Sequence, residues 1–197
     1  KLAELNWQRN QEWQTPFTPE NARPAVYAFN GDVYVGLDAY TIPVDQLEVL
    51  QDKLRILSGL YGVLKPLDLI QPYRLEMGTK LETKKGSNLY DYWGSKIAKA
   101  LNEVAQGKTL INLASQEYFK AVDTKVLKSE VITIHFKEYK NGTYQIIGLF
   151  AKQARGMMTN FAIKEKITNP EQLKTFHEGG YEYAEGLSSS KEWVFVR

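Results

Sequence analysis

The fold is predicted from one stretch of the chain, Leu54-Arg-Ile-Leu-Ser-Gly-Leu-Tyr-Gly-Val-Leu-Lys-Pro-Leu-Asp-Leu-Ile-Gln-Pro-Tyr-Arg-Leu-Glu-Met-Gly78. Its first residues end a helix expected over residues 44–57, whose apolar positions recur at three- and four-residue spacing and share one face: Val44, Leu47, Leu50, Leu54 and Leu57. A glycine-bearing turn follows at residues 58–62, and a second short apolar element occupies residues 63–70. This layout predicts a helix-hairpin-helix over residues 44–70.

A helix-hairpin-helix binds the sugar–phosphate backbone of DNA through its turn. Gly59 and Gly62 carry no side chain and allow close approach, and free N–H groups at the start of the next helix can bind phosphate. Lys65 adds a point charge beside the turn, and Arg74 adds a bidentate fork. The same glycine spacing also occurs in plain tight turns, and Pro66 removes a backbone donor from the second helix unless it lies in the first turn.

Helices and strands alternate along the rest of the chain. Further helices are predicted over residues 1–13, 91–105, 115–122 (with Ser115 as its cap) and 151–167. Strands are predicted over residues 26–30, 33–36, 110–113, 131–139, 143–149 and 193–196. The first two strands would form a hairpin, and Asn141-Gly142 predicts a type I′ turn in another. Interleaved helices and antiparallel hairpins without regular βαβ units predict an α+β fold.

Length and composition predict one folded domain over residues 1–197. The chain is 43% hydrophobic and 24% charged, as ordinary globular proteins are. Its 25 basic and 23 acidic residues leave a net charge of +2, which is too small to identify a polyanionic partner by itself. No apolar run reaches the roughly 20 residues that span a bilayer, and the start lacks a signal-peptide pattern, so neither membrane insertion nor signal-driven export is expected.

Several kinds of active site are disfavoured by the residues present. The chain has no cysteine, which excludes a disulfide framework, a thiolate nucleophile and a cysteine zinc site. His135 and His177 match no metal-ligand spacing, so no metal site and no cofactor are expected. The sequence contains neither a Gly-x-Ser-x-Gly elbow of serine hydrolases nor the phosphate-binding loop of nucleotide hydrolases.

As a whole string, residues 54–78 resemble the signature of the YaaA family of bacterial peroxide-stress-response proteins. The resemblance continues through residues 112–120 and 152–161 and covers nearly all of the chain in the family's order. It implies a cytoplasmic protein that helps cells survive hydrogen peroxide, associated with lower free intracellular iron and less oxidative damage. Members of the family open with a strand bearing a Ser-Pro-Ala-Lys motif, so we expect that this N-terminal segment is missing before Lys1.

The resemblance also implies a DNA-binding protein with a helix-hairpin-helix beside a positively charged cleft. The expected partner is double-stranded DNA that is bent or otherwise distorted, bound without sequence specificity by a protein expected to be a monomer. Carried over by position, the turn is residues 58–62, with Lys65 and Arg74 in the segment after it. With Tyr73, which lies between Pro72 and Arg74, and two cations of the predicted helix 151–167, the candidate DNA-binding residues are Ser58, Gly59, Tyr61, Gly62, Lys65, Tyr73, Arg74, Lys152 and Arg155. Lys152 and Arg155 lie three residues apart on one predicted helix face, so we expect them to line the same cleft as the turn.

Other basic and aromatic residues have a plainer interpretation. Lys80, Lys84 and Lys85 alternate with Glu82, which is typical of a mixed-charge surface loop. Aromatic side chains around the turn can stack on exposed bases, yet they more often pack in a core: Tyr61, Tyr73, Tyr90, Tyr92 and Trp93.

Two other functions stay open beside DNA binding. In a DNA lyase, Lys65 would attack a sugar carbon with help from Asp68 or Glu76, by analogy with helix-hairpin-helix enzymes of base excision. In a protein that acts through another protein, the turn would only pack the core, and Gly62→Asp would unfold the domain.

Overall fold

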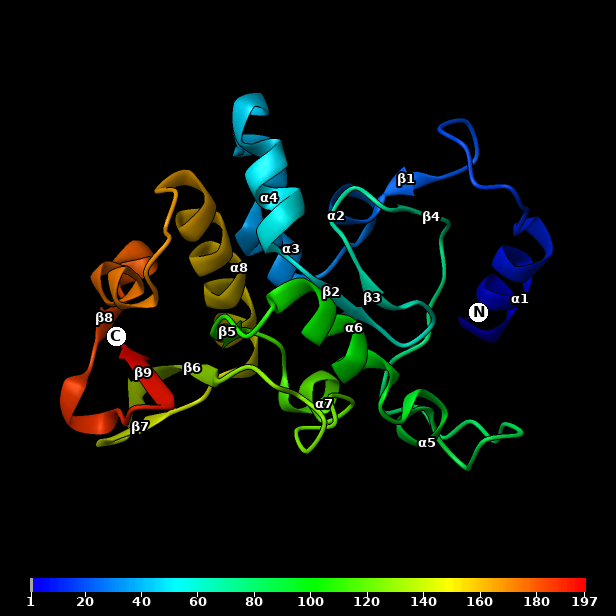
Figure 1. Cartoon of the computed structure of the whole chain (residues 1–197). Coiled ribbons are helices and arrows are strands. Elements are labelled where there is room, and N and C mark those ends of the chain that lie inside the picture. The colour runs from blue at the N-terminus through cyan, green and yellow to red at the C-terminus, as the bar shows by residue number, and fades with distance from the viewer. Residues whose placement is uncertain (1) are drawn as a thin grey trace.

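The computed structural model describes residues 2–197, with side chains from residue 4 onward, and has the predicted α+β fold (Figure 1). Its main sheet has the strand order β5 (Leu110–Asn112), β6 (Val131–Lys140), β9 (Glu192–Val196), β8 (Glu182–Tyr183). β6 pairs in parallel with both β5 and β9, whereas β8 runs antiparallel to β9. The sheet is therefore mixed, which the expectation of antiparallel hairpins alone did not include.

β7 (Thr143–Gln145) pairs antiparallel with β6 through the predicted type I′ turn. Asn141 and Gly142 have φ values of 53° and 81°, so both central residues are left-handed as that turn requires. This prediction is confirmed, although the second strand is shorter than expected because α8 begins at Gly148.

α8 (Gly148–Lys164) packs one face against the main sheet. The core between them holds buried apolar side chains from both: Ala151, Ala154, Met158 and Phe161 of α8, and Ile134, Phe136 and Phe195 of the sheet. The opposite face of α8 lies on α3 (Asp32–Leu37), and there the two backbones touch. A Cβ atom on Gly36 would lie 2.0 Å from the carbonyl oxygen of Gln153, and one on Gly156 would lie 1.9 Å from that of Val33.

The hairpin predicted over residues 26–36 is wrong, because these residues form α2 (Ala25–Ala28) and α3. The valines of this segment favour a strand locally, but packing on α8 and a side-chain cap override that preference. The buried amide of Asn160 donates to the carbonyl oxygen of Leu37 at 2.6 Å and to Thr41 Oγ1 at 3.1 Å. A residue from far along the chain thus completes the end of α3.

The helix-hairpin-helix predicted over residues 44–70 is also wrong. After α4 (Leu47–Lys53), β2 (Ile56–Ser58) and β3 (Gly62–Leu64) pair antiparallel, and β4 (Leu69–Ile70) pairs with β1 (Arg23–Pro24). Ser58 Oγ accepts the backbone N–H groups of Leu60 and Tyr61 at 3.2 and 2.9 Å and closes the turn. Burial alternates from residue to residue along β2 and β3, as it does in strands. The leucine spacing of the preceding residues favoured a helix, so the sequence-based prediction missed these strands.

α5 (Leu89–Trp93), α6 (Lys96–Ala105) and α7 (Gln116–Phe119) surround a second core. The single helix predicted over residues 91–105 is two helices, because the chain turns at Gly94, whose φ is 49°. Ser115 caps α7 as predicted, with Oγ accepting the N–H of Tyr118 at 3.4 Å.

The remaining elements complete the chain. α1 (Leu2–Glu12) confirms the predicted N-terminal helix and lies at the opposite end of the molecule from β9 (Figure 1). No helix among residues 2–197 is long and apolar enough to cross a membrane. Short 3-10 helices are η1 (Ala39–Thr41), η2 (Val44–Gln46), η3 (Pro170–Thr175), η4 (Glu178–Gly180) and η5 (Glu185–Leu187).

The contact between α3 and α8 predicts the effect of Gly156→Ala. Backbone atoms cannot rotate away from the added methyl group, so the free energy of unfolding should fall by about 2–3 kcal/mol in urea denaturation. Gly148→Ala in the same helix is the matched control, since a Cβ there meets nothing within 4 Å. Its stability should stay within about 1 kcal/mol of the parent's. Equal stability of the two variants would contradict the close contact.

Candidate functional site: a lysine face over α5, α6 and α7

Three residues of the predicted turn are buried and hold α5 in place, whereas Leu60 at its tip is exposed. Ser58 is 1% exposed, and Gly59 and Gly62 are buried with it. The carbonyl oxygen of Gly59 accepts the indole N–H of Trp93 at 3.0 Å, and a Cβ on Gly62 would lie 2.8 Å from that ring. Gly62 therefore makes room for Trp93, whereas a Cβ on Gly59 would lie 2.4 Å from the carbonyl oxygen of Leu75. Both glycines are buried, so their backbone is not presented to solvent.

Tyr61 and Tyr73 are half-buried beside the same turn. Tyr73 shares a hydrogen bond of 2.6 Å with Ser58 Oγ, and its ring centre lies 5.3 Å from that of Tyr61. The rings of Phe17 and Phe29 complete this aromatic row. Burial raises the pKa of Tyr73 to about 12. Both tyrosines thus pack in the protein.

The predicted cations of the site differ in their partners. Arg74 forms an ion pair with Glu76 at 3.1 Å, and Lys152 forms one with Asp32 at 3.7 Å. The guanidinium of Arg155 is half-buried, and desolvation lowers its pKa. Of these four predicted cations, which all lie in the described part of the chain, only Lys65 is both exposed and without an ion pair.

The turn and the α8 cations lie on elements with different main packing partners. α8 packs against α3 and β6, whereas the β2–β3 hairpin packs against α6 and α7. The carboxylates of the lyase hypothesis are also engaged, because Asp68 accepts the backbone N–H of Lys65 at 2.7 Å and Glu76 pairs with Arg74.

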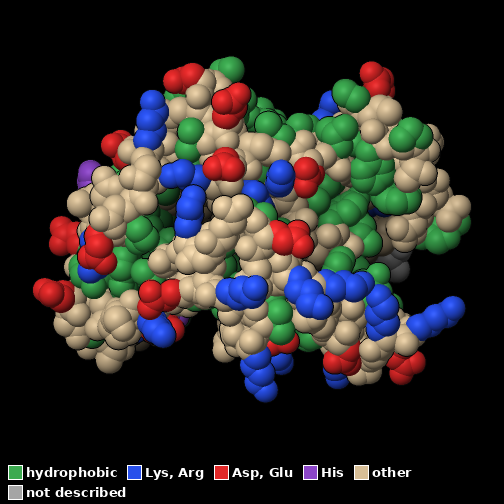
Figure 2. Space-filling view, in the orientation of Figure 1, with side chains coloured by type: hydrophobic (Ala, Val, Ile, Leu, Met, Phe, Trp, Pro, Cys, Tyr) green, Lys and Arg blue, Asp and Glu red, His purple; other side chains and the backbone are tan. Residues whose placement is uncertain are grey.

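A different cationic surface lies over α5, α6 and α7. Six exposed lysines form it, and we call it the lysine face: Lys85, Lys96, Lys99, Lys120, Lys125 and Lys128. None of the six forms an ion pair with a described carboxylate. Figure 2 shows Lys and Arg side chains gathered in a band across the lower half of the molecule, over α6 and beside α5.

Aromatic rings of α5 lie beneath three of these lysines. Lys85 and Lys96 have their Nζ atoms 4.8 and 5.3 Å from the centre of the Tyr92 ring, and Lys120 Nζ lies 4.9 Å from that of Tyr90. These are cation–π distances, which favour the charged ammonium over the ring face. The neighbouring Lys85 ammonium also lowers the pKa of Lys96, because it can donate a hydrogen bond to the neutral Lys96 amine and repels a second positive charge.

Two ordered loops hold lysines against these helices. In the first, Asp91 Oδ2 accepts the backbone N–H of Ser87 at 3.2 Å, and a Cβ on Gly86 would lie 2.2 Å from that of Asp91. In the second, the Asn102 side chain donates to the carbonyl oxygen of Val126 at 2.9 Å and accepts the N–H of Lys128 at 2.7 Å. The positions of Lys85 and Lys128 are therefore set by contacts with α5 and α6.

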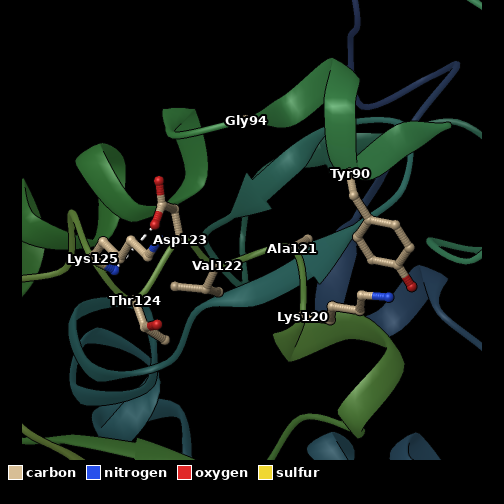
Figure 3. Close-up of a pocket in the computed structure, with 8 residues that line it drawn as sticks. All are labelled: Tyr90, Gly94, Lys120, Ala121, Val122, Asp123, Thr124 and Lys125. Atoms are coloured by element: carbon tan, nitrogen blue, oxygen red, sulfur yellow. Dashed lines mark hydrogen bonds between the residues drawn. The ribbon is translucent and has the colours of Figure 1, made fainter. Parts of the chain in front are cut away.

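A shallow pocket of about 360 Å³ opens between the α5–α6 junction and the segment after α7 (Figure 3). Tyr90 and Lys120 lie together on one side of it, and Asp123 on the other side accepts the backbone N–H of Lys125 at 3.0 Å. Charged groups of both signs thus lie at the edge of a hollow within the lysine face.

Sequence reasoning missed most of this surface. It interpreted Lys85 as part of a mixed-charge loop and the aromatic residues of α5 as core. One signal was present, because Tyr92 and Lys96 are four residues apart, a spacing at which helical side chains meet. The break at Gly94 and the return of the chain beside α6 could not be foreseen from it.

The fold and this surface together define a one-domain α+β protein with an unpaired lysine face. A sequence profile described as "Peroxide stress protein YaaA" matches residues 1–187. Similar proteins named UPF0246 occur in Neisseria meningitidis serogroup A, at 56% identity, and in Flavobacterium johnsoniae, at 57%. The alignments cover 100% of this chain and 77% and 79% of those proteins. The chain belongs to the peroxide stress protein YaaA family.

The burial of Tyr73 predicts how stability changes in alkali. Its pKa is about 12 in the folded protein and near 10 when unfolded, so its contribution is complete below pH 10 and is lost as pH rises toward 12. Between these values, the free energy of unfolding should fall less steeply in Tyr73→Phe than in the parent. Denaturant titrations at pH 9, 10 and 11 measure this. Tyr144→Phe, at an exposed tyrosine, should follow the parent, and identical slopes in all three proteins would refute the prediction.

Proposed function

We propose that this protein binds duplex DNA without sequence specificity, through the lysine face, as part of the peroxide stress response. The observation that carries the proposal is the grouping of six exposed lysines that have no carboxylate partner among the described residues. Phosphate groups of a nucleic acid would supply the missing negative charge. Contacts of this kind position a protein on DNA and do not distinguish bases.

We expect the protein to prefer bent or otherwise distorted duplex DNA, because its net charge is small. With a net charge of +2, the protein has little long-range attraction to DNA and gains most from the local lysine face. Bending a duplex costs about 1–6 kcal/mol, which DNA that is already distorted spares the protein. Family resemblance supports the same preference.

We propose that the link to free iron is indirect. Metal titration by calorimetry would contradict this if it showed a stoichiometric, submicromolar ferrous site. The monomeric state and the cytoplasmic location stay predictions, and light scattering and cell fractionation test them.

DNA binding is tested by fluorescence anisotropy of straight and bulged duplexes across a salt series. Each lysine–phosphate contact adds about 0.9 to the slope of log affinity against log salt. Lys99→Gln with Lys128→Gln should therefore weaken binding and reduce the slope by about 1.8. Lys140→Gln with Lys191→Gln removes the same charge from exposed positions at the ends of sheet strands and should bind as the parent does.

Three results would count against this proposal. The first is a parent protein that binds neither duplex, and the second is binding that survives molar salt. Equal losses in the two double variants would show that net charge matters and the lysine face does not. For the lyase alternative, a borohydride-trapped cross-link to abasic-site DNA that disappears in Lys65→Gln would favour enzymatic function.

A further inference from the structure

Lys85 and Lys96 differ from the other lysines of the face because they lie against each other. Both Nζ atoms lie over the Tyr92 ring, at 4.8 and 5.3 Å from its centre. Lys96 Nζ is also 5.9 Å from the centre of the Trp93 ring. Neither lysine has a described carboxylate partner, so two positive charges are held together without compensation.

The pair is held in place from both sides. Thr83 and Gly86 form a bridged turn, with the N–H of Thr83 donating to the carbonyl oxygen of Gly86 at 2.8 Å and that of Lys85 donating to Thr83 Oγ1 at 3.1 Å. On the other side, Lys96 is the first residue of α6, which follows the anchored Trp93 by one short turn. Since the backbone of both lysines is already ordered, binding an anion costs little further ordering.

We propose that Lys85 and Lys96 form a binding site for a phosphate monoester dianion, such as the terminal phosphate of a DNA strand at an end or a nick. Two adjacent ammonium groups match a ligand with close to two negative charges and three free acceptor oxygens. An internal phosphodiester carries one charge and two free oxygens, so it compensates the pair less completely. The inference rests on the proposed DNA binding and names the feature of DNA that this part of the lysine face recognises.

The inference is tested with two nicked duplexes that differ only in a 5′-phosphate or a 5′-hydroxyl at the nick. In fluorescence anisotropy, the parent protein should bind the phosphorylated nick about tenfold tighter, as expected for one charge-assisted contact of about 1.4 kcal/mol. Lys85→Gln with Lys96→Gln should abolish that ratio, because binding to the phosphorylated nick weakens about tenfold more than binding to the hydroxyl nick. Circular dichroism checks that this variant of two exposed residues is folded.

Lys99→Gln with Lys128→Gln is the matched control. It removes the same charge from the same face and should weaken both complexes while leaving the ratio unchanged. Equal binding of the two nicks by the parent overturns the inference and leaves the proposed function intact. A preference that persists in Lys85→Gln with Lys96→Gln overturns the assignment to these residues.

Calorimetric titration with deoxyadenosine 5′-monophosphate separates the site from DNA binding. One-to-one binding that is lost in Lys85→Gln with Lys96→Gln supports the phosphate site even where no duplex binds, and it identifies a free nucleotide as the source of the phosphate. If neither the mononucleotide nor the phosphorylated nick depends on the two lysines, the inference is refuted.

Discussion

The backbone contact between α3 and α8 is the constraint on which the rest of the structure depends. Gly36 and Gly156 leave no room for a Cβ atom, so the two helices approach as closely as their main chains allow. α8 thereby packs on both sides, with Met158 in the core of the main sheet and Ile163 in the core beneath α4. Asn160 ends α3 from the same side. One helix thus joins the main sheet to the N-terminal elements.

The glycines of the β2–β3 turn serve a related purpose. Gly62 leaves room for the large Trp93 ring, and the carbonyl oxygen of Gly59 accepts its N–H. This contact anchors α5. Tyr92, the residue before Trp93 in that helix, lies under two lysines. A segment that resembles a phosphate-binding turn in sequence therefore supports a cationic surface formed by other elements. Proposals about DNA accordingly move from the turn to the lysine face.

Local chemistry explains which predictions are confirmed. Asn141-Gly142 specifies a type I′ turn because both residues tolerate positive φ, and Ser115 caps α7 with its own hydroxyl. The predictions over residues 26–36 and 44–70 are wrong because contacts distant in sequence decide those segments. α3 depends on Gly156 and Asn160, which lie more than one hundred residues away along the chain. The lysine face could not be predicted for the same reason, because its lysines come from four separate segments of the chain.

The sequence by itself determined the α+β class, the family and most of the helices and strands of the C-terminal half. The fold class and these elements follow from composition, from period and from turn and cap residues that act within a few positions of themselves. The family follows from the resemblance of residues 54–78, 112–120 and 152–161 to its motifs. Only the tertiary structure decided that the Ser58 turn is buried and that Lys85 and Lys96 share one aromatic ring. Burial and the meeting of like charges depend on where distant segments come together in space, and no local pattern records that.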